Sequence, residues 1–360
     1  MCRLKSMVAV AAVLFETGLL FLGLQMVTIY DIARTTGYSA PTISKALNGT
    51  GKLNPATREK IVKVAKDMGY EFNMAAKTLA TKKSNLIGVV YEDNKMWAGF
   101  DHPLFGGVMN WLRDELEAAG YDIVFLSRNP EINYLDHAKL RSVDGVAIIN
   151  PNLEDNLHLA SLAASGIPCI STNDYIPGVC TVLTDNEESG YAGTEYLVNH
   201  GHTKIAFIAG PINQTSAAAL ERYKGFRRCL KKHNIRYNDV LFEECPLWDI
   251  QSGYDAFARL YRRTNDFTAI FAADDMLAFG VLQYAEEHNI AVPKQISLIG
   301  FDDDRISSFC RPRLTTFQQD KKQIAEIAAE TLLFLIAGIP APHIVRIPAR
   351  LIERDSVRRL

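Results

Sequence analysis

The chain has 360 residues and a formal net charge of −2, and this near-neutral total conceals two regions of opposite sign. Residues 26–83 contain ten lysines and arginines but only four carboxylates, a net charge of +6, whereas residues 84–360 carry −9. This asymmetry predicts that a polyanion binds near one end of the chain. The six cysteines show neither disulfide-like pairing nor metal-ligand spacing, which agrees with a reducing cytoplasm.

The first 25 residues do not fit the rest of the chain. Residues 8–24 are apolar apart from Glu16 and follow Arg3 and Lys5, an order that resembles the start of a signal peptide. The apolar stretch spans about 17 residues, which is marginal for a membrane helix, and a carboxylate lies near its centre. We interpret residues 1–25 as a start assigned too far upstream or an extension without a function in DNA binding. A membrane-tethered regulator is the alternative.

A helix-turn-helix is predicted within residues 26–72. Ile29, Ile32 and Ala33 have helical spacing, and Gly37 permits the sharp reversal between two helices. Ser39 is a good N-cap for the second helix, because its hydroxyl can accept from a backbone N–H of the first turn. The outward face of that helix combines small, hydroxyl and cationic side chains, which suits the major groove of DNA. Helical hairpins without a DNA-binding role share the same glycine turn and serine cap.

A third, amphipathic helix is predicted from Ala56 to Met68, with Asn54 as N-cap and Pro55 in the first turn. Three short helices in a basic segment favour DNA binding. Residues 27–83 resemble the DNA-binding region of the lac repressor family of bacterial transcription regulators, and the likeness continues to the C-terminus. The resemblance implies that the following headpiece residues contact DNA: Thr28, Tyr30, Ser39, Ala40, Pro41, Thr42, Ser44, Lys45 and Asn48.

Pro41 departs from the family pattern at a main base-reading position. Because proline offers no side-chain hydrogen bond, we expect operator choice to depend on apolar contacts of Ala40 and Pro41, with thymine methyl groups as candidate partners. Thr42 and Lys45 would add polar contacts.

Residues 73–84 are predicted to form a hinge helix and linker. The resemblance implies that residues 73–80 fold when two subunits meet on DNA and that Leu79 enters the minor groove beside Lys77. An apolar wedge of this kind bends the duplex, and eight residues are too few for a stable isolated helix. The alternative is an alanine-rich linker whose leucine packs on the body. The implied DNA contacts here are Asn73, Ala76, Lys77 and Leu79.

Residues 85–360 alternate between apolar strands and amphipathic helices. Helices are predicted from Phe105 to Gly120, from Tyr191 to Asn199 and from Arg222 to His233. This alternation is typical of parallel sheets covered by helices on both faces. Strands are predicted at 86–91, 122–126, 145–149, 168–171, 204–209, 269–272 and 297–300.

The resemblance implies a small all-α helix-turn-helix headpiece plus an α/β periplasmic-binding-protein-like body of two doubly wound subdomains. The implied body covers residues 85–360 and holds a ligand in the cleft between its halves. Subdomain one would comprise residues 85–185 with 314–341, and subdomain two residues 186–313 with 342–360.

Polar residues that follow the predicted strands are candidates for this cleft, because ligands bind beyond the carboxyl ends of parallel strands. Asparagine and aspartate can bridge vicinal hydroxyls, arginine donates in a planar fork, and an indole can pack on the apolar face of a sugar. Each position also has a structural interpretation: helix capping for Asp or Asn, an ion pair between Arg222 and Asp302, and core packing for Trp248. The effector-binding positions that the resemblance implies are Glu92, Asn150, Asn173, Arg222, Trp248, Asp274 and Asp302.

Two departures make the implied pocket acidic. The family usually has Asn-Asp where this chain has Asp274-Asp275, and Glu92 replaces a small hydroxyl residue. These changes favour a sugar over a nucleotide or sugar phosphate. Other side chains that could line the cleft are Phe100, Asp101, Phe105 and Arg128.

An enzyme is the other class to weigh. The aspartates at 274–275 and 302–304 suggest a Mg²⁺ site, and His200 and His202 could be mistaken for metal ligands. No glycine-rich phosphate loop, nucleophile elbow or His-Glu metal motif accompanies them. We therefore expect no catalytic residues, no metal and no cofactor.

The sequence thus predicts a homodimeric, cytoplasmic transcription regulator, a repressor of carbohydrate-utilisation genes that binds a pseudo-palindromic operator and a small-molecule effector. An exported or membrane-anchored sugar-binding protein is the alternative, although it leaves the headpiece without a role. A phosphocarrier protein acts as corepressor in part of the family, and the sequence leaves this partner open. No leucine-heptad tail follows residues 353–357, so a dimer is expected rather than a tetramer.

Overall fold

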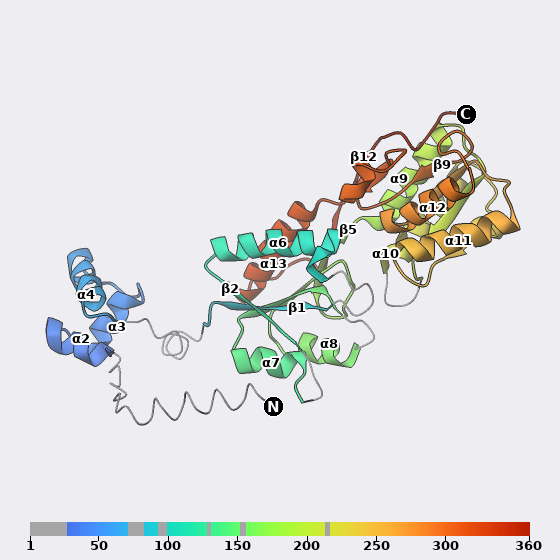
Figure 1. Cartoon of the computed structure of the whole chain (residues 1–360). Helices are drawn as coiled ribbons and strands as arrows, with labels where there is room; N and C mark the ends of the chain where they lie inside the picture. The colour runs from blue at the N-terminus through green and yellow to red at the C-terminus, as the bar shows by residue number, and fades with distance from the viewer. Residues whose placement is uncertain (1–26, 71–82, 93–98, 128–130, 152–155, 213–216) are drawn as a thin grey trace, which may run out of the picture. The chain divides into compact units, whose positions relative to one another are not determined.

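The computed structural model forms two compact units, within residues 1–83 and 84–360, which are described separately (Figure 1). The described residues are 27–70, 83–92, 99–127, 131–151, 156–212 and 217–360. The N-terminal extension and the predicted DNA contacts Asn73, Ala76, Lys77 and Leu79 lie outside this part of the chain, as does Arg128. Within the described residues, no helix combines the length and apolarity needed to cross a bilayer.

The N-terminal unit contains α2 (Ile29–Thr36), α3 (Ala40–Leu47) and α4 (Pro55–Asp67), as the sequence predicts. Thr28 and Asp31 form a reciprocal capping box at the start of α2, and Gly37, with φ of 76°, ends it. The core consists of Ile32, Ile43, Ala46, Ile61 and Ala65.

Two details of this unit differ from expectation. The Ser39 hydroxyl lies 2.9 Å from the Thr42 hydroxyl and makes no cap hydrogen bond to the backbone. Asn54 caps helix α4 and Pro55 lies in its first turn, as predicted, but the helix ends at Asp67 rather than at Met68, which is its C-cap. The Arg58 guanidinium fixes the turn before α4 by donating to the carbonyl oxygens of residues 49–51 at 3.2–3.3 Å.

The first subdomain of the C-terminal unit is a six-stranded parallel sheet with the order β11-β5-β4-β3-β1-β2. Helices α6 (Pro103–Ala118) and α13 (Lys321–Ile336) cover one face, and α7 (Tyr134–Arg141) and α8 (Asn156–Ala163) cover the other (Figure 1). The short 3-10 helix η1 (Gly99–Asp101) precedes α6. The strands are β1 (Leu86–Tyr91), β2 (Asp122–Phe125), β3 (Gly145–Asn150), β4 (Cys169–Thr172), β5 (Cys180–Thr184) and β11 (Ile344–Ile347).

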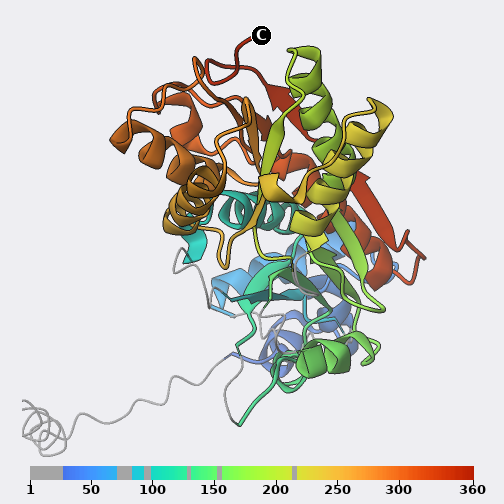
Figure 2. The ribbon, with the colours of Figure 1, turned by 90° about the vertical axis from the view of Figure 1, so that its right-hand side faces the viewer.

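The second subdomain is a four-stranded parallel sheet with the order β7-β6-β8-β9. Helices α9 (Asn186–Asn199) and α10 (Ala217–Lys232) cover one face, and α11 (Ile250–Arg263) and α12 (Asp275–Glu287) cover the other (Figure 2). The remaining elements are β6 (Ile205–Ala209), β7 (Phe242–Glu244), β8 (Ala269–Ala272), β9 (Ser297–Ile299), η3 (Asp239–Leu241) and η4 (Arg305–Ser308), with β10 (Thr316–Gln318) paired antiparallel to β12 (Arg350–Ile352).

Strand pairing corrects the expected division of the C-terminal segments. Strand β11 pairs with β5, so residues 344–347 extend the first sheet rather than the second. Residues 315 and 318 form β-bridges with residues 299 and 302 of the second subdomain. The expected division placed residues 315 and 318 in the first subdomain. These crossings depend on contacts between residues far apart in sequence, which local periodicity does not report.

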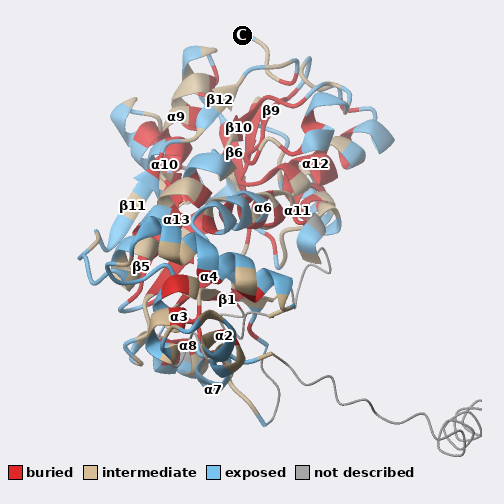
Figure 3. Ribbon diagram, turned by 90° about the vertical axis from the view of Figure 1, so that its left-hand side faces the viewer, coloured by how far each residue is buried: buried red, intermediate tan, exposed pale blue. Residues whose placement is uncertain are grey.

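Two helices of the second subdomain begin earlier than predicted. Helix α9 starts at Asn186, capped by Asp185, rather than at Tyr191, because its first turn is polar and lacks an apolar stripe. Helix α10 starts at Ala217, which places Arg222 inside the helix rather than at its beginning. Buried residues follow the strands and the inward helix faces, and the outer faces are exposed (Figure 3).

Candidate functional site

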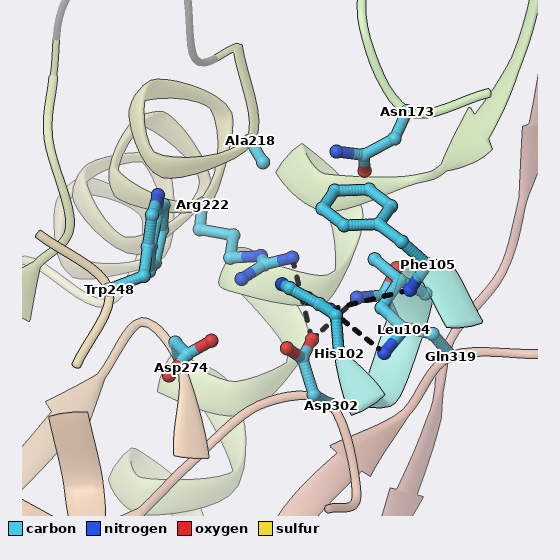
Figure 4. A pocket seen from close by; sticks show the side chains of 10 residues that line it. All are labelled: His102, Leu104, Phe105, Asn173, Ala218, Arg222, Trp248, Asp274, Asp302 and Gln319. Carbon is cyan, nitrogen blue, oxygen red and sulfur yellow. Dashed lines mark hydrogen bonds and ion pairs between the residues drawn. The ribbon is translucent and has the colours of Figure 1, made fainter. Parts of the chain in front are cut away.

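A cavity opens at the carboxyl ends of strands from both subdomains, where ligands bind in α/β folds (Figure 4). Its enclosed volume is about 70 Å³, well below the roughly 300–1,000 Å³ of small-molecule pockets. A sugar-sized ligand therefore requires the two walls to separate or their side chains to move. The lining residues are His102, Leu104, Phe105, Asn173, Ala218, Arg222, Trp248, Asp274, Asp302 and Gln319.

Arg222 is the cation of this cavity and is only 3% exposed. Helices α9 and α10 approach each other closely enough that a methyl group on Gly190 would lie 2.1 Å from the Arg222 carbonyl oxygen. The guanidinium stacks 3.6 Å from the centre of the Phe301 ring and donates to the Asn186 Oδ1 at 2.9 Å and the Ala273 carbonyl at 2.5 Å. Burial lowers the pKa of Arg222, and neighbouring carboxylates oppose this shift. The side chain is thus held in one orientation before any ligand arrives.

Asp302 follows β9 and has a left-handed φ of 112°. Its Oδ1 accepts from the Gln319 amide at 2.5 Å and lies 3.9 Å from Arg222 Nη2. The Gln319 carbonyl in turn accepts from the hydroxyl of Thr184, at the end of β5. Gln319 therefore connects the strand ends of the two subdomains at the floor of the cavity.

Asp274 follows β8 and caps α12, accepting from the backbone N–H groups of Met276 at 2.6 Å and Leu277 at 3.3 Å. Burial and the nearby Asp302 and Asp275 raise the pKa of Asp274 well above its ordinary value. The next residue, Asp275, is fully enclosed and accepts from Ser307, Thr316 and the backbone of Asp304 at 2.6–2.8 Å. Burial raises the pKa of Asp275 to about 8, although these donors oppose the shift.

Among the described residues, those that line the first-subdomain wall include no aspartate, glutamate, lysine or arginine. Asn173 follows β4 with a left-handed φ of 78°, and its amide points into the cavity (Figure 4). His102 caps α6 by accepting through Nδ1 from the N–H groups of Leu104 at 3.2 Å and Phe105 at 3.4 Å. The Phe105 ring lies 4.3 Å from the His102 ring, between centroids.

Trp248 faces Arg222 from the loop before α11, with 6.0 Å between the guanidinium carbon and the ring centre. Gly210 makes room for this indole, because a methyl group there would lie 2.5 Å from its ring atoms. An aromatic plane beside buried polar groups suits a ring with one apolar face and several hydroxyls.

Five of the seven predicted effector residues line the cavity: Asn173, Arg222, Trp248, Asp274 and Asp302. Glu92 and Asn150 lie outside the lining, joined by a 2.7 Å backbone hydrogen bond, and remain predictions. Reasoning from the sequence missed His102, Leu104, Ala218 and Gln319. The helix-cap position of His102 before Pro103 was the available signal, whereas Gln319 reaches the cavity only through the crossing of the chain.

The remaining acidic and histidine candidates have structural partners. Asp303 accepts from Arg354 at 2.6 Å and from Gln318 at 2.9 Å, and Asp304 caps η4. The ring nitrogens of His202 lie 2.9 Å from the Thr268 hydroxyl and 3.1 Å from the Arg358 carbonyl. Within the described ranges, no group of three or more His, Cys, Asp and Glu side chains is placed to hold a metal ion.

The N-terminal unit presents the predicted DNA contacts mainly at its surface. Tyr30 is 67% exposed, and Pro41 and Lys45 are exposed on α3. Five of the predicted contacts are also hydrogen-bonded within the unit: Thr28 in the capping box, Ser39 and Thr42 with each other at 2.9 Å, and Ser44, which accepts from the Asn48 amide at 3.2 Å. A small helix-turn-helix unit and a two-subdomain body with a polar cleft, in one chain, define a ligand-binding regulator of transcription.

Comparison with known proteins supports this class. Residues 28–73 match the bacterial regulatory proteins of the lacI family, and residues 194–357 match a periplasmic binding protein-like domain. The chain is 28% identical over 343 residues to catabolite control protein A of Priestia megaterium, covering 92% of this chain and 99% of that protein. It is 30% identical over 339 residues to the probable HTH-type transcriptional repressor ExuR of Bacillus subtilis, covering 93% and 99%.

A solved complex of the transcriptional regulator CelR with cellobiose has a TM-score of 0.67 and 26% identity, covering 92% of this chain and 99% of that one. The chain belongs to the lacI family of bacterial transcriptional regulators. It is a DNA-binding regulator with a ligand-binding body, and it is not an enzyme.

Proposed function

We propose that this regulator is a homodimeric, cytoplasmic repressor of carbohydrate-utilisation genes whose affinity for a pseudo-palindromic operator is set by a sugar in the cleft. One observation carries the proposal: Arg222, Trp248 and Asp302 converge on a single cavity between the subdomains of a chain that also has a helix-turn-helix. The cellobiose bound to CelR, a relative of similar fold, supports a sugar as the class of ligand.

The exposed face of α3 supports the DNA-binding half of the proposal. Pro41 and Lys45 are exposed there, and the +6 charge of residues 26–83 suits attraction to phosphates. Leu79 and Lys77 lie outside the described residues, and the insertion of Leu79 into the minor groove beside Lys77 follows from the family resemblance alone.

Exposed apolar side chains support a dimer. Ile306 and Phe309 are 50% and 75% exposed on one short segment at η4, and Trp111 is 41% exposed on α6. Water contact with large apolar side chains is unfavourable, so a second copy that covers them would be stabilised. Two headpieces would then read the two halves of a palindromic site.

The ligand would act by differential affinity for two arrangements of the subdomains. A sugar that contacts both walls binds a closed cleft better than an open one, and this difference shifts the population between them. If the hinge segments of the two subunits lie at a different distance from each other in the two arrangements, ligand binding changes operator affinity. By reciprocity, operator binding changes ligand affinity by the same coupling free energy.

The test begins with selection of bound duplexes from a random-sequence library by the full-length protein. Fluorescence anisotropy then measures operator affinity with and without mono- and disaccharides, at several salt concentrations. We expect salt-dependent, palindromic binding that one sugar alters at least fivefold. Sugar binding without any DNA binding would instead favour the exported sugar-binding protein.

A further inference from the structure

Two carboxyl groups on the second-subdomain wall, those of Asp274 and Asp302, point toward each other along one side of the cavity (Figure 4). Both residues are 8% exposed. Backbone N–H groups donate to Oδ1 of Asp274, and the Gln319 amide donates to Oδ1 of Asp302. The two carboxyl groups are also close enough to share a hydrogen bond when one of them is protonated, and this pair borders the space that a ligand would fill.

The cavity has too little positive charge for both carboxylates. Arg222 directs Nε and Nη1 at the neutral oxygens of Asn186 and Ala273, and only Nη2 approaches Asp302, at 3.9 Å. Like charges in a buried site favour retention of a proton by one member. The raised pKa of Asp274 fits this arrangement, because a higher pKa means that the carboxyl group retains its proton more readily.

We propose that the effector carries a protonated amino group that lies between Asp274 and Asp302, which makes it an amino sugar or a related cationic polyol rather than a neutral sugar. The proposal rests on the proposed function, since it names the class of ligand for the same cavity. An ammonium has three donors and no acceptor, which matches two facing carboxylate oxygens. A neutral hydroxyl donates once and leaves the negative charge uncompensated.

The other lining groups accommodate the rest of such a ligand. Trp248 offers a flat apolar surface, and the Asn173 amide and Arg222 Nη2 can contact ring hydroxyls from the two sides. On binding, the ammonium takes the place of the proton on Asp274, which passes to solvent, and both carboxyl groups are then ionised. Sugar phosphates and sugar acids would place a second anion against these carboxylates and are excluded by repulsion.

The experiment is isothermal titration calorimetry on the full-length protein with matched pairs of probes, in phosphate buffer and in a second amine-free buffer with a different ionisation enthalpy. The pairs are glucosamine with glucose, galactosamine with galactose and mannosamine with mannose, and N-acetylated sugars provide neutral amides. Tris and pentaerythritol form a minimal pair, because they differ mainly in an ammonium in place of a hydroxymethyl group. We expect at least one amine to bind tenfold or more tightly than its neutral partner, with proton release detected from the dependence of the heat on buffer.

Asp274→Asn is the decisive variant, since asparagine keeps an oxygen that can cap α12. We expect it to reduce the preference for the amine at least tenfold and to remove the proton release. Asp266→Asn is the control, because Asp266 is exposed and pairs with Lys204 away from the cavity. A neutral sugar that binds as tightly as its amine, an amine preference that survives in Asp274→Asn, or a panel in which no amine binds would overturn the proposal.

Operator binding separates this failure from that of the proposed function. If a neutral sugar alters operator affinity and no amine does, the result supports a sugar-controlled repressor and contradicts the proposal of a cationic effector. If the protein binds no operator at all, the proposed function itself fails.

Discussion

The two walls of the cleft differ in chemistry. The second-subdomain wall holds three charged residues, Arg222, Asp274 and Asp302, each less than one-tenth exposed. The first-subdomain wall faces them with Asn173, His102 and apolar side chains. The second wall is therefore suited to bind the polar groups of a ligand, and the first wall is suited to close over it. Binding and response should accordingly be separable by mutation.

A cluster beside the cavity joins the two walls. Glu221, directly before Arg222 on α10, accepts from Arg346 of β11 at 2.8 and 3.0 Å. The hydroxyl of Tyr175, in the loop after β4, donates to the same carboxylate at 3.0 Å. We call Tyr175, Glu221 and Arg346 the clasp. Because its members come from both subdomains, the clasp joins the two walls beside the cavity.

The largest expected effect comes from removing a charge on the second wall. Arg222→Ala leaves the buried Asp274 and Asp302 without a cation, and Asp302→Ala removes the partner of Arg222 and Gln319. Truncation of one partner in a buried charged pair costs about 2–5 kcal/mol. We expect effector binding, measured by calorimetry, to fall at least thirtyfold, with operator affinity retained. Arg228→Ala, on the exposed face of the same helix, is the control, and an unaltered effector response in Arg222→Ala would remove it from the site.

A smaller effect is expected from a substitution in the predicted hinge, outside both walls of the cleft. Leu79→Ala should weaken operator binding by about 1–3 kcal/mol, since the loss of an apolar wedge forgoes the contacts that a bent duplex permits. Effector affinity should stay within twofold of the wild type, because both walls are intact. Anisotropy with selected operator DNA and calorimetry with effector measure the two quantities. Unchanged operator affinity would contradict the assignment of Leu79 to a DNA-inserting hinge.

The sequence predicts one wall better than the other for a physical reason. Strands β6 and β8 are continuous apolar runs, so their ends, and the polar Asp274 beyond β8, can be located from local pattern. Asp302 likewise follows the strand predicted at 297–300, whereas Arg222 is implied by the family resemblance, and both residues line the cavity. His102 and Gln319 were missed, because their positions depend on a helix start after an irregular loop and on a chain crossing.

The same limit applies to the fold. Strands β10 and β12 have three residues each and are defined only by each other, although more than thirty residues separate them. The pairing of β11 with β5 likewise carries no local signal, which explains why the division of the C-terminal segments was wrong. Alternation of strands and helices predicts layers well, whereas the exchange of segments between layers is a property of the tertiary structure.

Weakening the clasp tests whether the walls are coupled. Glu221→Gln retains the shape of the side chain but loses its charge, and the Glu221 side chain is only 12% exposed. We expect effector affinity to fall about three- to tenfold, since a partly buried ion pair contributes roughly 1 kcal/mol. Glu187→Gln is the matched control, because it removes an ion pair with Arg228 that lies within the second subdomain, and it should leave effector affinity unchanged. Equal effector affinities of wild type and Glu221→Gln would show that the clasp does not bias closure.

The smallest effect concerns the stability of the second wall at different pH values. A carboxyl group whose pKa is higher in the folded chain retains a proton that the unfolded chain releases, so stability falls as pH rises from the ordinary value of 3.8 toward the folded value. Asp274 and Asp275 both have raised pKa values, the latter about 8. We therefore expect the Tm to fall between pH 6 and pH 8 by about 2–4 °C for a loss of 1 kcal/mol.

Asp274→Asn removes one of these two titrating groups, so its Tm should depend less on pH than that of the wild type, whereas Asp266→Asn should follow the wild type. Differential scanning calorimetry of the three proteins at pH 6, 7 and 8 makes the comparison. If Asp274→Asn shows the full wild-type pH dependence, Asp274 is already ionised in the empty cleft, and the charge of the second wall is balanced without a ligand. If the dependence weakens, the wall holds a proton that a cationic ligand can replace, and its chemistry differs from the first wall in charge as well as in composition.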